Sequence, residues 1–165
     1  MRTGRVFYYL SAFSILFLCC SSVSGLVIKR SLEDRVALSD LIIVGQVQEI
    51  RSQWNAPKTH IWTYVTVSRD ECIKGSNIPK NIVVMIPGGI VKEEGIMQEI
   101  EGTPGFSLHE RVLLMLRFLP DLQLYALVNS EYSKFRITET NQVAEENISK
   151  DEFIQKIKRI MASSR

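Results

Sequence analysis

The stretch HIWTYVTVS, residues 60–68, alternates between two kinds of side chain. One set of alternate positions holds Ile61, Thr63, Val65 and Val67, and the other holds Trp62, Tyr64 and Thr66. Successive side chains of a strand point to opposite faces, and β-branched and aromatic residues favour strands. This stretch is therefore the clearest strand signal in the chain.

Two further stretches predict strands that are buried on both faces. Residues 41–50 begin with LIIV and pass into an alternation from Gln46, and Gly45 between them permits a bulge or a close strand crossing. Residues 112–119, VLLMLRFL, are almost continuously apolar and stop at a Pro120-Asp121 turn. Apolar runs of this length are typical of strands within a core.

Shorter strands and turns fill the rest of the chain. Strands are predicted at residues 81–86, 89–92, 96–100, 124–128 and 134–137, a turn at 74–77 and a loop at 53–58. No helix of crossover length separates these strands, so a parallel α/β sheet is not expected.

A helix is predicted at each end of the strand series. Ser31 is placed as the N-cap of a short helix that ends near Ser39. Ser149 and Glu152 form a capping box for a helix over residues 150–162. Its apolar stripe, expected to pack on the sheet, consists of Phe153, Ile157, Ile160 and Met161. The predicted fold class is mainly β: a small antiparallel OB-like barrel of about six or seven strands, flanked by these helices, in one domain over residues 25–165.

The N-terminus has the pattern of a secretory signal peptide. Arg2 and Arg5 precede an apolar stretch over residues 6–20, and small residues follow up to Gly25. This predicts a signal peptide over residues 1–24 and an exported protein, periplasmic or secreted. Two alternatives stay open. One is an uncleaved membrane anchor, although its apolar core is short for the roughly 20 residues of a membrane span. The other is a lipid-modified Cys19 or Cys20, as in bacterial lipoproteins.

Removal of residues 1–24 changes the charge and the thiols. It takes away two arginines and no acidic residue, so 18 basic side chains remain against 18 acidic ones. A neutral protein is not expected to bind nucleic acid, which requires clustered Lys and Arg. Cys72 remains as a single cysteine without an internal disulfide partner, and we expect it to pack as a small apolar side chain.

Motifs of catalysis are incomplete. His109-Glu110 begins like a zinc-protease motif, but Leu113 stands where the second histidine is required. No metal site, cofactor or enzymatic activity is therefore predicted. A hydrolase that uses His109 and Glu110 would need both side chains to converge with a nucleophile in one pocket.

Three aromatic residues are the candidate ligand-binding residues. Trp54 and Trp62 flank the loop before the 60–68 strand, and Tyr64 shares a strand face with Trp62. An exposed aromatic face beside a loop would mark a binding site. The alternative is that Trp62 and Tyr64 cover the core under a terminal helix.

Several segments resemble a family of exported, uncharacterised bacterial proteins. They are SDLIIVGQV (39–47), WN (54–55), YVTV (64–67), CIKG (72–75), IPGG (86–89), GTPGF (102–106), residues 110–116 and residues 132–135. The resemblance covers roughly residues 32–137 and consists of turns and core positions. More distantly, the layout resembles the netrin-like OB barrel of the tissue inhibitors of metalloproteinases. This resemblance implies an OB-like fold.

The predicted function is that of an exported, non-enzymatic binding module. Its partner is expected to be an extracellular or envelope protein, such as a protease, and the sequence leaves its oligomeric state open. The alternative is a membrane-anchored envelope protein with a structural or lipid-contacting role. The amphipathic C-terminal helix and the cysteines near residue 20 suggest this alternative.

Overall fold

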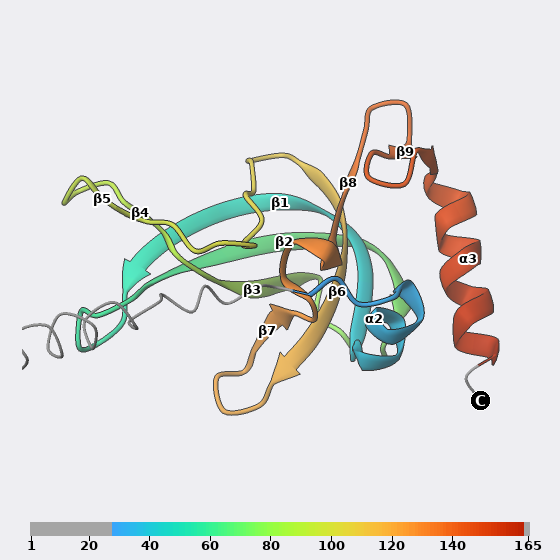
Figure 1. Ribbon diagram of the computed structural model, residues 1–165, viewed down its shortest axis with the longest axis horizontal. Helices are drawn as coiled ribbons and strands as arrows, with labels where there is room; N and C mark the ends of the chain where they lie inside the picture. The colour runs from blue at the N-terminus through green and yellow to red at the C-terminus, as the bar shows by residue number, and fades with distance from the viewer. Residues whose placement is uncertain (1–27, 164–165) are drawn as a thin grey trace, which may run out of the picture.

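The chain forms a mainly β fold, as predicted, and within residues 28–163 two α-helices lie beside an eight-stranded sheet (Figure 1). The structure is a computed structural model that describes residues 28–163, so the predicted signal peptide and its two cysteines lie outside the described residues. The strands of the large sheet are β1 (Leu41–Trp54), β2 (Ile61–Lys74), β3 (Asn81–Pro87), β6 (Arg111–Leu119), β7 (Leu124–Leu127), β8 (Lys134–Ile137), β9 (Gln142–Val143) and β10 (Ile148–Ser149). Strands β4 (Gly89–Val91) and β5 (Ile96–Gln98) form a separate hairpin, and the helices are α2 (Leu32–Leu38) and α3 (Lys150–Ser163).

Strand β1 pairs with two neighbours, which determines the order of the sheet. Its first half pairs with β6, beginning at Leu41 opposite Leu116, and it pairs with β2 as far as Trp54 opposite Ile61. The order then runs from β2 to β3, β7 and β6. All pairings are antiparallel except that of β3 with β7, which are parallel at Val84 and Tyr125. The prediction of a purely antiparallel sheet is therefore wrong at this pairing. Both strands lie two antiparallel steps from β1, one through β2 and the other through β6, so they must run in the same direction.

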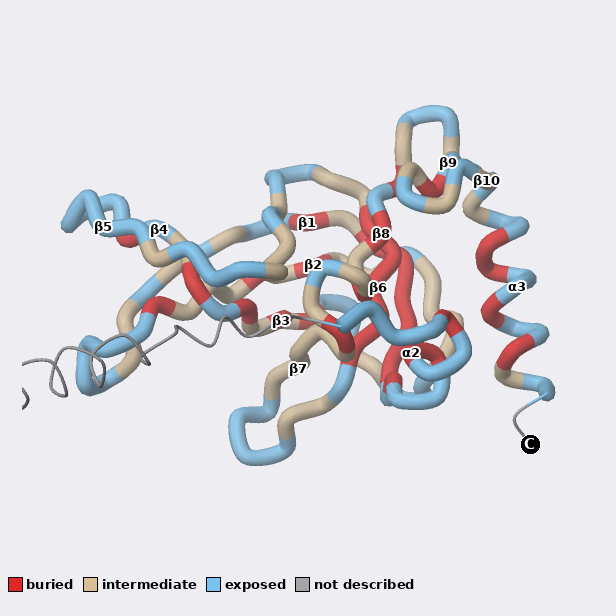
Figure 2. The backbone as a smooth tube through the Cα atoms, viewed as in Figure 1, coloured by how far each residue is buried: buried red, intermediate tan, exposed pale blue. Residues whose placement is uncertain are grey.

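Two apolar clusters lie on the two faces of β1 and β6, as the apolar runs predict. The inner cluster consists of Leu41, Ile43, Val47, Val65, Val67, Ile82, Val84, Ile86, Val112, Leu114 and Leu116. The helix cluster consists of Leu32, Val36, Ile42, Val44, Leu113, Met115, Phe135, Ile137, Val143, Phe153, Ile154, Ile157 and Ile160. Figure 2 shows the buried segments in the middle of the sheet and along one side of α3.

Both predicted helices begin at their predicted caps. The Asp34 backbone N–H donates to the Ser31 hydroxyl at 3.0 Å, and the Glu152 N–H donates to the Ser149 hydroxyl at 3.2 Å. The stripe of α3 is buried at Phe153, Ile157 and Ile160, and Met161 packs beside it. The prediction that this stripe packs on the sheet is confirmed. The apolar face on which a lipid-contacting role would depend is thus occupied within the chain.

The strands are more numerous, and two of them longer, than predicted. Within residues 28–163 ten strands are formed, not six or seven: all eight segments predicted as strands form strands, and β9 and β10, which have two residues each and show no periodic signal, are added to them. Strand β1 continues through Trp54, so the predicted loop over residues 53–58 begins two residues later. The β1–β2 hairpin therefore extends beyond the β6 pairing, and β4 packs against its outer end.

Gly45 has the role that its position predicts. The β1–β2 register shifts between Val44 and Gly45, as in a β-bulge, and a Cβ on Gly45 would lie 2.5 Å from the backbone oxygen of Ser68. Only glycine allows the two strands to approach so closely at this point.

Candidate binding surface

A face of the β1–β2–β3 sheet presents Trp62 and Tyr64 side by side. Residues directly opposite each other in antiparallel strands share a face, and so do residues two apart on one strand. Trp62 lies opposite Gln53 on β1 and Pro87 on β3, and Tyr64 lies opposite Arg51 and Met85. The next row adds Glu49, Thr66 and Val83. We call these nine residues the aromatic platform: Glu49, Arg51, Gln53, Trp62, Tyr64, Thr66, Val83, Met85 and Pro87.

The platform is only partly buried. Its aromatic residues, Thr66, Val83 and Met85 are half-buried, and the remaining four residues are exposed. Helices α2 and α3 bury their apolar sides against residues such as Ile42 and Leu113 in the helix cluster, not against the platform. Within residues 28–163, no terminal helix therefore covers Trp62 and Tyr64, in contrast to the alternative stated above.

Trp54 is separated from the other two candidate residues. It lies opposite Ile61, and so on the other face of the hairpin from Trp62. There its indole N–H donates to the Glu94 carboxylate at 3.1 Å. The face on which Trp54 lies depends on its pairing with Ile61, and the sequence alone does not predict that register. Arg51 and Met85 carry no signal of a site in the local sequence, because their strands flank β2 only in the folded chain.

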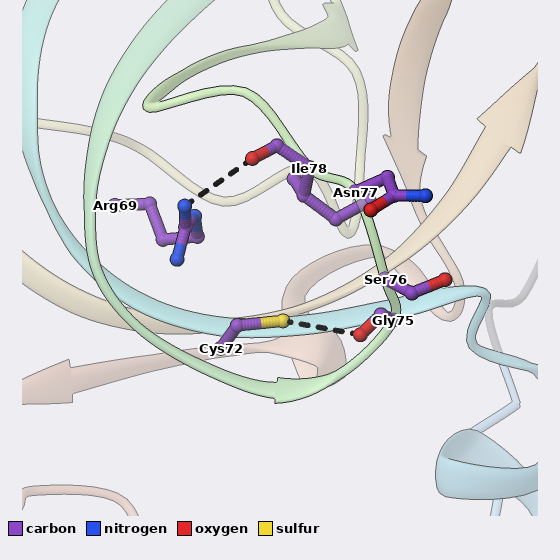
Figure 3. Close-up of a pocket in the computed structure, with 6 residues that line it drawn as sticks. All are labelled: Arg69, Cys72, Gly75, Ser76, Asn77 and Ile78. Carbon is purple, nitrogen blue, oxygen red and sulfur yellow. Dashed lines mark hydrogen bonds between the residues drawn. The ribbon is translucent and has the colours of Figure 1, made fainter.

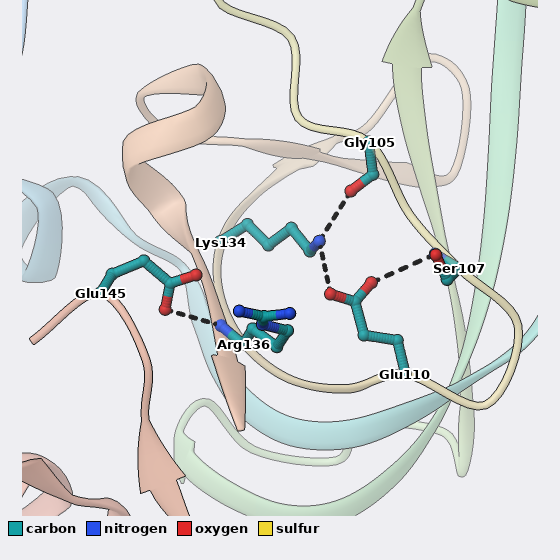
Figure 4. Close-up of polar contacts among 6 residues, drawn as sticks. All are labelled: Gly105, Ser107, Glu110, Lys134, Arg136 and Glu145. Carbon is teal, nitrogen blue, oxygen red and sulfur yellow. Dashed lines mark hydrogen bonds and ion pairs between the residues drawn. The ribbon is translucent and has the colours of Figure 1, made fainter. Parts of the chain in front are cut away.

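Glu110 is held in a polar network with Lys134 and Ser107 (Figure 4). Its carboxylate accepts from the Lys134 ammonium at 2.7 Å, with both side chains nearly buried, and from the Ser107 backbone N–H at 3.1 Å. His109 lies in an exposed turn at φ 64°, where its backbone N–H donates to the Val47 oxygen. His109 thus lies in an exposed turn, and the Glu110 carboxylate is engaged by Lys134 and Ser107, so the structure gives no support to the hydrolase hypothesis.

A shallow pocket of about 270 Å³ lies beside the turn between β2 and β3 (Figure 3). The Cys72 thiol points toward the backbone oxygens of Lys74 and Gly75, and the Arg69 guanidinium donates to the Ile78 oxygen at 3.2 Å. Cys72 is half-buried and packs against the inner cluster, as predicted for a structural cysteine. Both side chains that offer chemistry in this pocket are thus engaged with backbone.

An adjoining depression of about 500 Å³ contains Tyr125, whose ring packs against Phe118 at 5.2 Å between centroids. Burial, together with the nearby Asp40 carboxyl and Cys72, raises the pKa of the Tyr125 phenol above its usual value of 10.0. The unfolded chain therefore ionises first as pH rises, and the stability that the neutral phenol contributes is lost through the alkaline range.

We expect Tyr125→Phe to remove part of this alkaline loss. Between neutral pH and pH values above 10, the free energy of unfolding should fall less in Tyr125→Phe than in the wild type, because phenylalanine has no proton to lose. Urea unfolding at neutral pH and above pH 10 measures it, with Tyr132→Phe as the matched control. Equal alkaline losses in the wild type and in Tyr125→Phe would contradict the prediction.

Within residues 28–163, no three His, Cys, Asp or Glu side chains are grouped so that they could hold a metal ion. No helix in that range combines the length and apolar character required to cross a membrane. Neither a scan against models of known protein families nor a search of curated proteins finds a match to this chain.

Proposed function

We propose that the chain is an exported, non-enzymatic binding module whose ligand is another protein, in the cell envelope or outside the cell. The observation that carries the proposal is the aromatic platform, which the helices of the described chain leave accessible. Its contact residues would be Trp62 and Tyr64 with their neighbours on β1 and β3.

The composition of the platform favours a protein ligand. Aromatic residues, Met and Arg are the residue types enriched in protein interfaces, and Trp, Tyr and Arg dominate their binding energy. Trp62, Tyr64, Met85 and Arg51 supply these types in two neighbouring rows. The β3 side of the platform is apolar and the β1 side is polar, so one edge can exclude water while the other orients a partner.

The strand pairing supports the finer proposal of an OB-like barrel. The order β1, β2, β3, β7 and β6 returns to β1 through its pairing with β6. In OB-folds the face of the second and third strands binds ligands, and the platform lies mainly on β2 and β3. The resemblances to exported bacterial proteins and to netrin-like barrels belong to the same proposal.

Affinity capture with the immobilised protein tests this function. Wild type and Tyr132→Ala should retain a common protein from the culture medium or envelope fraction. The double variant Trp62→Ala with Tyr64→Ala should bind it about 1,000-fold more weakly, since two hot-spot aromatics at about 2 kcal/mol each contribute about 4 kcal/mol together. Titration of the recovered partner measures the change. If wild type retains nothing beyond what the double variant retains, the proposed function is wrong.

A further inference from the structure

The β4–β5 hairpin lies at the end of the molecule away from α3, and most of it is exposed (Figures 1 and 2). Ile90, Ile96, Met97 and Ile100 are 49%, 40%, 64% and 38% exposed. Ile90 pairs with Met97, and Val91, which is 7% exposed, pairs with Ile96. Because Val91 faces the rest of the chain, Ile90 and Met97 face solvent. Such a concentration of exposed apolar side chains is typical of an interaction site.

The hairpin is firmly attached to the β1–β2 hairpin. The Gly88 N–H donates to the Ile61 oxygen at 2.8 Å, the Thr63 hydroxyl donates to the Gly88 oxygen at 2.6 Å, and the Ile61 N–H donates to the Gln98 side-chain oxygen at 2.6 Å. Gly89 has φ 137°, and any Cβ there would clash with the Thr63 hydroxyl. A segment held in this way loses little conformational entropy when a partner binds.

Acidic residues neighbour these exposed apolar residues in the sequence. Between residues 88 and 102 there is one cation, Lys92, and four carboxylates: Glu93, Glu94, Glu99 and Glu101. Glu94 is close to the Lys58 ammonium, at 3.5 Å, and accepts from Trp54. The other three carboxylates form no ion pair within the described part of the chain. We call residues 88–102 the acidic hairpin.

We propose that the acidic hairpin docks into an apolar groove, rimmed by Lys and Arg, on a second protein. The negative charge of the hairpin favours this partner over two others, a second copy of the chain and a membrane surface. A second copy of this chain docked hairpin to hairpin would bring carboxylates against carboxylates, and an anionic membrane surface would repel them. A cationic rim attracts them and speeds association, while Ile90 and Met97 supply the apolar contact. The acidic hairpin shares no residue with the aromatic platform, so this proposal stands apart from the proposed function.

Site-specific cross-linking in the cells that produce the full chain tests the proposal. A photoreactive p-benzoylphenylalanine replaces Met97, and in a matched control it replaces Leu122, which is 53% exposed on another turn. Each is combined with the charge reversals Glu99→Lys and Glu101→Lys, or with the control reversals Asp121→Lys and Glu139→Lys. All four acidic positions are exposed, so the reversals should leave the fold intact, as urea unfolding checks.

The expected result is an adduct of the Met97 site with one protein. Its yield should exceed that of the Leu122 site, and it should fall about tenfold on reversal at residues 99 and 101 but not in the control reversal. Mass spectrometry should place the cross-link on a partner peptide that contains Lys or Arg beside apolar residues. The proposal is overturned by a yield no greater than at Leu122, by a yield that charge reversal leaves unchanged, or by adducts only with a second copy or with lipid. Sedimentation with vesicles of phosphatidylglycerol and phosphatidylcholine that requires Ile90 and Met97 would overturn it as well.

Discussion

Phe153→Ala should lower the free energy of unfolding by about 3–5 kcal/mol, which is the usual cost of removing a buried phenylalanine side chain. The Phe153 side chain is fully buried in the helix cluster, and its ring lies 4.8 Å from that of Phe135, at an interplanar angle of 59°. The substitution removes this aromatic contact and leaves a cavity between α3 and the sheet. Urea denaturation measures the change through the shift of the midpoint.

Two variants of the same helix make this measurement decisive. Lys158→Ala changes an exposed residue and should stay within about 0.5 kcal/mol of wild type. If Phe153→Ala does not fold, Ile157→Val removes one buried methyl group and should cost about 0.5–1.5 kcal/mol. A loss below about 1 kcal/mol for Phe153→Ala would mean that α3 does not pack on the sheet as described.

Lys134→Met should cost about 3 kcal/mol, because it leaves the Glu110 carboxylate nearly buried without its cation. Glu110 and Lys134 side chains are 12% and 13% exposed. Lys134 also donates to the Gly105 oxygen at 2.6 Å and lies over the Phe106 ring at 4.7 Å. Phe106 in turn packs against the inner cluster, so this one ammonium attaches the loop before β6 to strand β8.

A double-mutant cycle separates the ion pair from the packing. Adding Glu110→Gln to Lys134→Met should restore part of the stability, since no unpaired charge is then left in a poorly hydrated site. The exposed pair Arg51–Glu49, at 2.5 Å and with 68% and 53% side-chain exposure, serves as the control. Arg51→Met should change stability by about 0–1 kcal/mol. A loss from Lys134→Met as small as that from Arg51→Met would show that the buried pair contributes no more than a surface pair.

Local patterns predicted most of the elements. Alternation over residues 60–68 and the apolar runs before Gly45 and after Arg111 correspond to β2, β1 and β6. Capping residues predicted where both helices begin, because a cap satisfies backbone groups within three residues of itself. The strands β9 and β10 were missed because two residues give no period.

The candidate site was predicted only in part. Tyr64 and Trp62 share a face because they are two residues apart on one strand, so sequence suffices for that pair. Trp54 depends on a cross-strand register, and Arg51 and Met85 reach the platform only through strand order. The Lys134–Glu110 pair joins residues 24 positions apart, and nothing in the local sequence connects them.

The sequence by itself determined where the longer strands lie, which of their faces are apolar, and where the helices α2 and α3 begin, because these properties depend on neighbours within a few residues. The tertiary structure decided that β1 pairs with β6 as well as β2, that β3 and β7 run parallel, and that the helices cover one part of the sheet and leave the aromatic platform accessible. These features depend on contacts between segments far apart in the chain. Strand order and register are selected by how all the apolar faces are buried together.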